Sequence, residues 1–469
     1  MSTPTPLRPF GLKDKIAYMT GDIANDMSFM MSAFFLMLFY TNVLEIPGYV
    51  VGILFLASRI LDAFTDVGMG RLVDTMKPFK EGRFRGIIRR VAPFVCLSGF
   101  LMFLYVVKDW SYSAKLTYVA ITYIIWGSFC YTAVNIPYGS MASVISSKPE
   151  DRASLSVFRS MGANVALLAI SFIVPLLIYK EVEGKQMIVP EMFTIIMGIL
   201  MVVAFGLYQF CWRNSIERVQ LPEKEGRRHD KNECFDDVKA IFTSLLTNKP
   251  LLIFIFVAII LLLSTLLIGT MNPYLYVDYF NSKIGFSVGG LLPVIASFVV
   301  APFAKTIVKK FGKKESASIA LLFTGIGYLT LFMLKVTNVW LYLAIALISL
   351  LGTNYFMVII WAFITDIIDH QYLKTNYRED GTIYAVYSFA RKIGQALAGG
   401  LSGVALSLVG YTPNILNQSA ETLNSIYNVA TLVPAVSSIA IFLILTFWYP
   451  LSKEVVDNNS RELEKRSQQ

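Results

Sequence analysis

Residues 55–70, FLASRILDAFTDVGMG, belong to an apolar run that is long enough to cross a lipid bilayer, yet they contain three charged side chains. These are Arg59, Asp62 and Asp66. Residues three or four positions apart share one face of a helix, so the three charges lie together. A charged group at the bilayer centre costs on the order of 2.5–3.5 kcal/mol. The three side chains must therefore face water or one another.

The balance of two acids and one base predicts what the cluster does. Arg59 neutralises one carboxylate, and the remaining negative charge favours a small cation or a proton. Thr65 lies beside Asp62 and Asp66 and offers a neutral oxygen ligand for Na⁺. The alternative is an internal salt bridge that joins this helix to a neighbour.

Composition places the whole chain in the membrane. Of its 469 residues 55% are hydrophobic and only 16% are charged, and the mean hydropathy is +0.58. These values are far from those of soluble domains and indicate an all-α membrane protein. We predict twelve transmembrane helices, at 16–42, 48–74, 87–108, 114–145, 153–179, 188–212, 250–280, 284–308, 315–335, 338–368, 381–410 and 424–449.

The net charge of +9 does not indicate nucleic-acid binding, because the basic residues occupy alternate loops. This distribution indicates which loops lie on the cytoplasmic side of the membrane. The two most basic loops follow the second and eighth helices and contain Arg71, Lys77, Lys80, Arg83, Arg85, Arg89 and Arg90, and Lys305, Lys309, Lys310, Lys313 and Lys314. The positive-inside rule puts both termini in the cytoplasm. We expect a multi-pass protein of the bacterial cytoplasmic membrane, without a cleaved signal peptide.

A polar segment divides the chain into two halves. We expect an N-terminal six-helix bundle at 1–212, a cytoplasmic linker at 213–249, a C-terminal six-helix bundle at 250–449 and a cytoplasmic tail at 450–469. A basic loop follows the second helix of each half, and cations lie in the fifth helix of each half. These parallels suggest two related bundles with a binding site near the membrane midplane between them.

Other polar side chains interrupt the first and fourth helices. Asp26 and Asn25 lie in the first, where Asp22 is closer to the helix end and suits a capping role. Tyr131 and Asn135 are four positions apart in the fourth helix. Thr132 lies between them, and Pro137 frees a main-chain carbonyl. This surface suits a polyol or a dehydrated ion, although a kinked helix packed against its neighbour is an equal alternative.

The eleventh helix carries cations too deep to reach the cytosol easily. Ser388, Arg391 and Lys392 lie on one side of it and can balance the acids of the first two helices. Trp361 and Tyr387 could form an apolar floor for a sugar ring. Arg159 is the corresponding cation of the fifth helix.

Catalytic and metal-binding patterns are missing from the sequence. Its four cysteines and two histidines have no metal-ligand spacing, and no Ser/His/Asp arrangement or Gly-rich phosphate loop is visible. We expect a transporter and not an enzyme, with no cofactor and with H⁺ or Na⁺ as the coupling ion.

The motifs together resemble the glycoside–pentoside–hexuronide:cation symporters, the melibiose permease family of the major facilitator superfamily. The resemblance covers the chain in order and rests on GDIANDMSF…FYTNV, SRILDAFTDVGMGRLVD, YTAVNIPYGSMASV…DRASLSVFRSMG and ITDIIDHQY…YSFARKIGQALAGG. NIPYGSMA and FARKIGQALAGG are most similar to bacterial glucuronide carriers.

The resemblance implies the major facilitator fold and a role for each matching residue. Asp62, Thr65, Asp66 and Thr132 fall on the cation site of melibiose permease. Asp26 falls on a carboxylate that binds sugar hydroxyls, Arg159 on a sugar-site arginine and Lys392 on a lysine near both sites.

At four positions this sequence differs from melibiose permease, and these differences bear on which sugar and which ion it binds. Asn135 replaces an aspartate that binds the galactosyl unit, and Gly139 replaces a tryptophan. Asn25 replaces a lysine and Thr65 an asparagine, so the resemblance leaves both H⁺ and Na⁺ open as the coupling ion. Loss of a negative charge favours an acidic sugar, with a β-glucuronide as the best candidate and a neutral glycoside or pentoside as its competitor. A lysolipid carrier on the same fold is a more remote alternative.

We also predict how the transporter is gated. The two basic loops and the acids at neighbouring helix ends should form a salt-bridge network that stabilises the outward-open state, with Asp74, Arg83, Arg85, Glu150, Asp151, Asp366 and Asp369 as its members. The expected partners are a small sugar and membrane lipid, and the expected functional state is a monomer.

Overall fold

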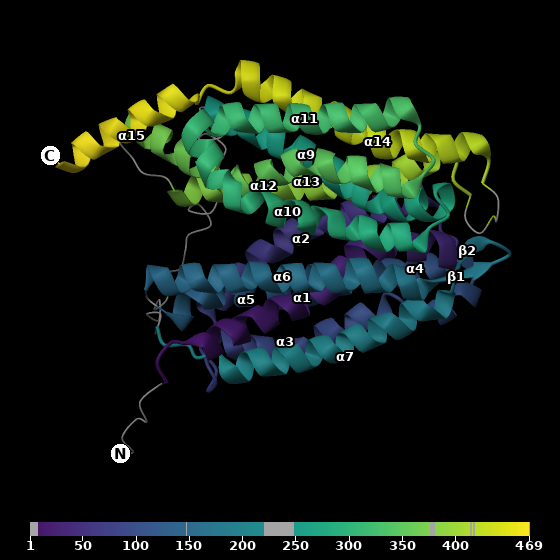
Figure 1. Ribbon diagram of the computed structural model, residues 1–469. Helices are drawn as coiled ribbons and strands as arrows, with labels where there is room; N and C mark the ends of the chain where they lie inside the picture. The colour runs from purple at the N-terminus through teal and green to yellow at the C-terminus, as the bar shows by residue number, and fades with distance from the viewer. Residues whose placement is uncertain are drawn as a thin grey trace. The chain divides into compact units, whose positions relative to one another are not determined.

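The computed structural model describes residues 8–146, 148–219, 248–375, 380–412, 415 and 418–468 (Figure 1). The chain folds into two compact units, of which the first contains the helices up to α7 and the second those from α9 to α15. Each unit is a bundle of long helices. The exact boundaries that the sequence suggested stay a prediction, because most of the linker lies outside the described residues.

The first unit consists of seven α-helices, short π- and 3₁₀-helical segments, and one β-hairpin. Its α-helices are α1 (Leu12–Leu38), α2 (Gly48–Thr75), α3 (Arg83–Leu101), α4 (Tyr112–Ile124), α5 (Thr132–Ile145), α6 (Pro149–Ile178) and α7 (Pro190–Asn214). The other elements are η1 (Phe39–Val43), η2 (Tyr105–Asp109), η3 (Ile125–Tyr131), β1 (Tyr179–Val182) and β2 (Lys185–Ile188). Helix α1 packs against α6 and α7, and α3 packs against α5 and α7.

The second unit is helical in all of its described elements. They are α9 (Lys249–Pro273), η4 (Tyr274–Tyr279), α10 (Lys283–Phe311), α11 (Lys313–Leu334), α12 (Val339–Thr375), α13 (Asp380–Leu408), α14 (Ala420–Leu443), η5 (Ile444–Trp448) and α15 (Lys453–Gln468). Helix α12 packs against both α10 and α11, α13 packs against α9, and α14 packs against α11.

Within the described residues, nine helical segments are long and apolar enough to cross a membrane. The segments outside this set, α2, α3 and α13, are among the predicted spans that carry charges. Helix α2 contains the Arg59, Asp62 and Asp66 cluster, and α3 begins with several arginines. The chain is a multi-pass membrane protein, while the count of twelve spans and the cytoplasmic termini stay predictions.

Side-chain caps explain where several helices begin. The side chains of Asn248, Ser282 and Ser419 accept hydrogen bonds from main-chain N–H groups in the first turns of α9, α10 and α14. Each cap satisfies a donor that has no partner inside the helix and contributes about 1 kcal/mol. These polar residues therefore fix the helix ends that length alone leaves uncertain.

Two details differ from the expected spans. The segment expected at 87–108 leaves the α-helix after Leu101 and continues as the 3₁₀ segment η2. The expected all-α fold also contains one antiparallel hairpin, β1–β2, which pairs Tyr179 with Ile188. Glu183 and Gly184 form its turn with φ values of 52° and 75°, as a two-residue turn with left-handed residues requires.

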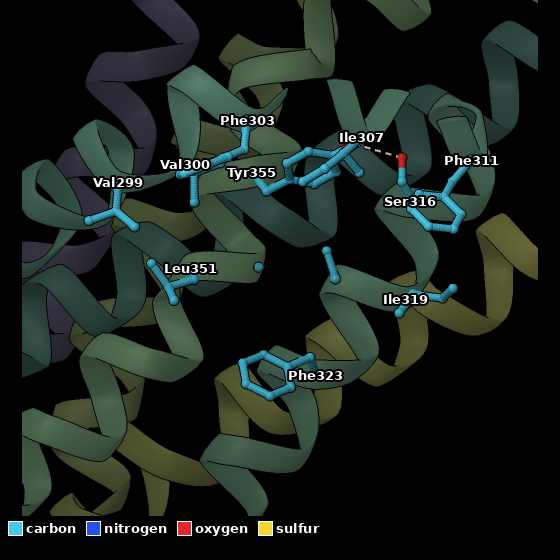
Figure 2. Close-up of a pocket in the computed structure, with 12 residues that line it drawn as sticks. Val299, Val300, Phe303, Ile307, Phe311, Ser316, Ile319, Phe323, Leu351 and Tyr355 are labelled. Atoms are coloured by element: carbon cyan, nitrogen blue, oxygen red, sulfur yellow. Dashed lines mark hydrogen bonds between the residues drawn. The ribbon is translucent and has the colours of Figure 1, made fainter. Parts of the chain in front are cut away.

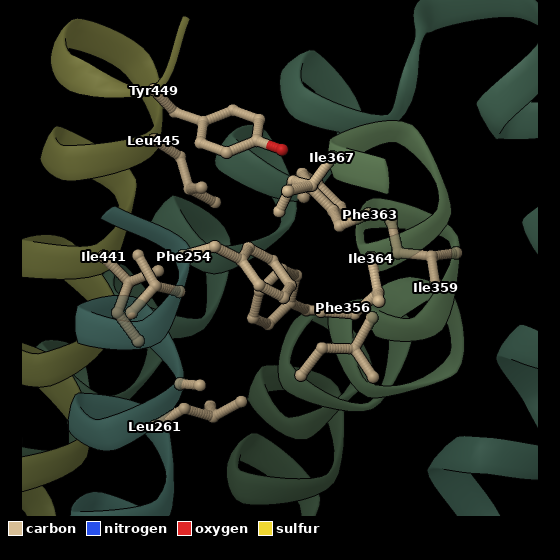
Figure 3. Close-up of a cluster of buried hydrophobic side chains, with 14 of the residues drawn as sticks. Phe254, Leu261, Phe356, Ile359, Phe363, Ile364, Ile367, Ile441, Leu445 and Tyr449 are labelled. Atoms are coloured by element: carbon tan, nitrogen blue, oxygen red, sulfur yellow. The ribbon is translucent and has the colours of Figure 1, made fainter. Parts of the chain in front are cut away.

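The core of the second unit holds the helices that carry its candidate sugar-site residues (Figure 3). Phe254 of α9 stacks on Phe363 of α12 with ring centroids 5.2 Å apart. Phe254 also contacts Tyr387 of α13 at 5.8 Å. This apolar contact fixes Tyr387 and, one turn later, Arg391 on α13.

Helices α11 and α12 touch at Gly352, which gives a test of the packing. A Cβ atom at Gly352 would overlap the carbonyl oxygen of Ala320 and crowd Thr324 Oγ1. We therefore expect Gly352→Ala to destabilise the protein by about 1–3 kcal/mol, as overpacking generally does. Thermal unfolding of the purified protein in detergent measures the effect.

Gly206→Ala in α7 is the matched control, because no atom lies within 4 Å of its added Cβ. Alanine is a better helix former than glycine, so the control should melt at the wild-type temperature or above it. A wild-type melting temperature for Gly352→Ala would contradict the close approach of α11 and α12.

Candidate functional site

The first acid of α2, Asp62, meets a hydroxyl from the neighbouring span. Ser128 donates to Asp62 Oδ1 at 2.5 Å. Arg59 Nη1 lies 3.2 Å from the other carboxylate oxygen of Asp62. The arginine and the hydroxyl therefore hold opposite oxygens of one carboxylate, which fixes its orientation.

The second acid, Asp66, has the same kind of partner one helical turn further on. Thr132 Oγ1 donates to Asp66 Oδ1 at 2.8 Å and also approaches the carbonyl oxygen of Gly127 at 3.3 Å. Thr65, in contrast, donates to the main-chain carbonyl of Asp62 at 3.1 Å. The structure thus joins Thr132 to the cluster as the sequence suggests, while the Thr65 hydroxyl points back at its own helix.

The two hydroxyls meet the two carboxylates because both pairs have the same spacing along their helices. Ser128 and Thr132 are four positions apart, as are Asp62 and Asp66, so two hydroxyls face two carboxylates in order. Gly127 lies next to this contact, where an added Cβ would make ordinary van der Waals contact with Asp62 Oδ1 at 3.8 Å. Ser128 belongs to the π-helical segment η3, and such segments often occur at functional sites.

Ser128 is the residue that the sequence reasoning missed. Its signal was its spacing, four residues before Thr132, which places both hydroxyls on one helical face. A serine in an apolar helix usually bonds to its own main chain, so this spacing alone does not indicate a ligand.

The Asp62–Asp66 cluster, together with Arg59, Ser128 and Thr132, has the chemistry of a site for a hard cation or a proton. Its ligands are carboxylate and hydroxyl oxygens, which Na⁺ and similar ions prefer. Arg59 also lies over the ring of Phe29, with 5.8 Å between its guanidinium carbon and the ring centroid. Among the described residues no group of three or more His, Cys, Asp or Glu side chains could hold a metal ion.

A second ion pair joins α1 to α6. Arg159 Nε donates to Asp22 Oδ1 at 2.9 Å, and the Asp22 side chain is only 6% exposed whereas that of Arg159 is 43% exposed. The capping role, one of the interpretations that the sequence left open for Asp22, is excluded because Asp22 lies in the interior of α1. Asp14 takes that role instead: its carboxylate accepts from the N–H of Gly11 and pairs with Arg218.

The guanidinium of Arg159 lies beside an aromatic ring and a glycine. Its carbon lies 5.4 Å from the ring centroid of Tyr138, and its Nη1 borders Gly139, where an added Cβ would be 3.9 Å away. Tyr18 also interacts with the Arg159 side chain, through its charge and through a side-chain hydrogen bond. The absence of a side chain at Gly139 therefore leaves Arg159 room for a ligand.

Asp26 and Asn25 are adjacent in α1 but differ in burial and in hydrogen bonding. Asp26 is half-buried and has no hydrogen-bond or ion-pair partner among the residues that the structure describes, while the charges of Asp22 and Arg159 both act on it. Asn25 is 1% exposed and accepts a hydrogen bond from Tyr208 at 2.6 Å. Its placement in the α1–α7 packing leaves it no open surface for a sugar.

Tyr131 and Asn135 lie near the junction of η3 and α5. Tyr131 stacks on Phe29 with ring centroids 5.7 Å apart. The Arg59 guanidinium also lies over the ring of Phe29. Asn135 is half-buried, one turn beyond Thr132. Both residues are therefore close in sequence to Ser128 and Thr132, which contact the acids of α2.

In the second unit, Trp361, Tyr387 and Arg391 come together. The rings of Trp361 and Tyr387 meet edge to face at 5.5 Å, and the Arg391 guanidinium carbon lies 5.8 Å from the Trp361 ring centroid. All three line a cavity of about 120 Å³. Lys392 is half-buried beside them in sequence, and the side chain of Ser388 is outside the described residues.

The expected gating residues Arg83 and Arg85 are fixed at the start of α3. Their main-chain N–H groups donate to the Glu217 carboxylate at 2.9 and 2.8 Å, and Arg85 Nε donates to the carbonyl of Trp212 at 2.7 Å. Nearby, a main-chain hydrogen bond and then the charges of two neighbouring arginines lower the pKa of Glu81. The α3 end is thus bound to the segment that follows α7.

The acids expected to complete the network are placed within their own units. Asp366 pairs with Lys313 at 2.5 Å, and Asp369 is half-buried three residues later. Asp151 accepts a hydrogen bond from Ser146 at 2.6 Å. The side chains of Asp74 and Glu150 are outside the described residues, so the predicted network stays a prediction.

Comparison with known proteins gives relatives along the whole chain. The symporter YjmB of Bacillus subtilis is 30% identical over 444 residues, which cover 94% of this chain and 93% of that protein. The glucuronide carrier protein homolog of Escherichia coli is 30% identical over 448 residues and 94% of both chains.

Solved structures share the fold at low sequence identity. The nucleoside transporter NupG has a TM-score of 0.63 at 12% identity, and 93% of this chain and 100% of that chain are covered. A D-xylose–proton symporter has a TM-score of 0.61 at 13% identity, with 94% and 98% covered. The major facilitator fold that the resemblance implied is confirmed.

The model of the family described as MFS/sugar transport protein matches residues 17–453. The match includes every helix that carries a candidate site residue. The chain therefore belongs to the MFS/sugar transport protein family, whose members are membrane transporters and not enzymes.

Proposed function

We propose that the chain is a secondary transporter that couples the uptake of a sugar acid, with a β-glucuronide as the best candidate, to H⁺ or Na⁺. The observation that carries the proposal is the pair of hydroxyl-bonded carboxylates, Asp62 and Asp66, inside a bundle of membrane helices. Groups of this kind are expensive in a membrane and mark ion pathways. The names of relatives, a glucuronide carrier homolog and a symporter, support it.

The coupling ion binds where Asp62 and Asp66 meet Ser128 and Thr132. Without the ion the cluster holds excess negative charge, since Arg59 balances only one carboxylate. Burying that charge behind a closed gate is unfavourable, so the closed state becomes accessible when the cation and the sugar are both bound. Transport then proceeds by alternating access, as in other transporters built from two repeated bundles.

The proposed sugar-binding groups are polar and aromatic side chains from both units. In the first unit these are Asp26, Asn135 and the terminal nitrogens of Arg159, with Tyr131 as an aromatic neighbour. In the second unit they are Arg391 and Lys392, with Trp361 and Tyr387 providing aromatic surface and Ser388 a hydroxyl. The cations recognise the carboxylate of a hexuronide, because an arginine binds a carboxylate through two parallel hydrogen bonds.

One observation favours a neutral glycoside as the second candidate. Asp22 already neutralises Arg159, so the first unit supplies no net positive charge for an acidic sugar. In that case the aromatic surface and the neutral amide of Asn135 would select the substrate.

Uptake into vesicles separates these candidates. Labelled nitrophenyl β-glucuronide and the matching β-glucoside are offered under an imposed pH gradient or an imposed Na⁺ gradient. We expect the glucuronide to accumulate under one of the two gradients. Accumulation of only the glucoside would refute the hexuronide assignment, and failure of both gradients to drive either sugar would refute the symporter.

A further inference from the structure

An apolar groove lies on the second unit, apart from the sugar-site residues. It has a volume of about 510 Å³ and lies between α10, α11 and α12, within the range of roughly 300–1,000 Å³ that ligand pockets occupy. Figure 2 shows Val299 and Phe303 of α10 across the hollow from Phe323 of α11, with Leu351 of α12 beside it.

The wall of the groove suits hydrocarbon and not sugar. Of its 12 lining residues only Ser316 and Tyr355 carry polar side chains. Tyr355 Oη donates to Ser316 Oγ at 2.7 Å, so the two satisfy each other. Phe303 is 62% and Phe323 is 49% exposed, so two rings project at the mouth of the groove without a protein neighbour to cover them.

The turn between α10 and α11 and the packing of both helices on α12 determine where the groove lies. Helix α10 ends and α11 begins at Gly312, whose φ is 91° and which leaves no room for a Cβ beside Glu315. From this corner both helices pack on α12, and Gly352 brings α12 close against α11. The groove therefore lies beside the corner between α10 and α11, and residues of α12 complete its lining.

The corner of the groove carries unpaired positive charge. Lys309 and Lys310 are exposed in the last turn of α10, and no described residue pairs with either amino group. Lys310 Nζ lies 5.2 Å from the ring centroid of Phe311, which lines the groove. A third cation, Lys453, donates to the carbonyl of Lys310 at 2.9 Å.

Other charged groups at this corner are already engaged. Lys313 pairs with Asp366, and Lys314 donates to the carbonyl of Tyr449. The carboxylate of Glu315 accepts from the main-chain N–H of Lys453. Two exposed lysines thus remain at the end of a hydrocarbon groove, on the side that the basic loops predict to be cytoplasmic.

We infer that this groove binds one acyl chain of an anionic phospholipid, whose phosphate contacts Lys309 and Lys310. Hydrocarbon surface and adjacent cations are the two features that a lipid of this class recognises, and basic pockets between membrane helices on the cytoplasmic side bind such headgroups. The apolar wall alone would accept any chain. The lysines add the preference for a negative headgroup.

Native mass spectrometry of the detergent-purified protein tests the inference. Phosphatidylglycerol and phosphatidylethanolamine with identical chains are titrated, and the bound fractions are compared. We expect one phosphatidylglycerol to bind in preference, and Lys309→Gln/Lys310→Gln to weaken it by roughly tenfold or more, since each lysine near a phosphate contributes substantially. The control Lys108→Gln/Lys180→Gln removes the same charge from the first unit and should bind as the wild type.

A second variant tests the groove itself. Ile319→Trp places a larger ring at an exposed lining position and should weaken phosphatidylglycerol binding several-fold. Ile326→Trp, at an exposed position of α11 outside the lining, is its matched control. Equal retention of both lipids, undiminished binding in Ile319→Trp, or equally strong displacement by soluble glycerol phosphate would overturn the inference.

Discussion

Asp62→Asn is expected to abolish uphill accumulation of sugar while leaving downhill sugar exchange intact. The substitution removes one of the two negative charges of the proposed cation site, and a hydrogen bond to a charged group contributes about 1.5–3 kcal/mol. A loss of this size weakens the cation site by roughly 10- to 100-fold. Accumulation under an imposed gradient and exchange between two equal sugar pools, measured in the same vesicles, separate the two activities.

Ser128→Ala tests the same site with a smaller change. It keeps both carboxylates and removes only the hydroxyl that donates to Asp62, so we expect the cation concentration for half-maximal uptake to rise by about tenfold. Ser160→Ala is the control, because that exposed hydroxyl bonds to the main chain of its own helix. Normal accumulation in Asp62→Asn would remove the α2 cluster from the coupling mechanism.

The ion pair between Asp22 and Arg159 has the second large expected effect. Arg159→Gln leaves a buried carboxylate without its partner, which costs about 3–5 kcal/mol in a fully buried pair. Because Arg159 is partly exposed, we expect a loss of roughly 2–3 kcal/mol in stability. Thermal unfolding should show this loss, and uptake of sugar should fall to background.

The double variant Asp22→Asn/Arg159→Gln distinguishes the two roles of Arg159. Removing both charges should restore most of the melting temperature, because no buried charge remains unpaired. If Arg159 also contacts the sugar, uptake stays lost. Full recovery of uptake would mean that Arg159 serves only to neutralise Asp22. Arg213→Gln, at an exposed position of α7, controls for the loss of an arginine.

Local patterns in the sequence predicted much of the fold. Membrane helices are apolar because they lie in lipid, and their approximate length follows from the thickness of the bilayer. The shared helical face of Arg59, Asp62 and Asp66 follows from helix geometry alone, and the structure pairs Arg59 with Asp62 as that geometry allows. The π-helical segments and the β-hairpin were not predicted, since they interrupt these periodic patterns.

The partners of the polar groups depended on packing between distant segments. Ser128 reaches Asp62 because η3 packs against α2. Arg159 reaches Asp22 because α1 and α6 meet at Gly162, where a Cβ would lie 2.8 Å from the carbonyl of Met19. Periodicity says which face a side chain occupies, but not which helix covers that face.

By itself, the sequence determined that this protein is a helical membrane transporter and that α2 carries a charged face, because hydrophobicity and helical period are local properties. Only the tertiary structure decided that Ser128 and Thr132 face the two acids of α2, that Asn25 is buried against Tyr208, and that three helices of the second unit enclose a groove. Each of these depends on which helices touch and in what register, and those contacts are made by residues far apart in the chain.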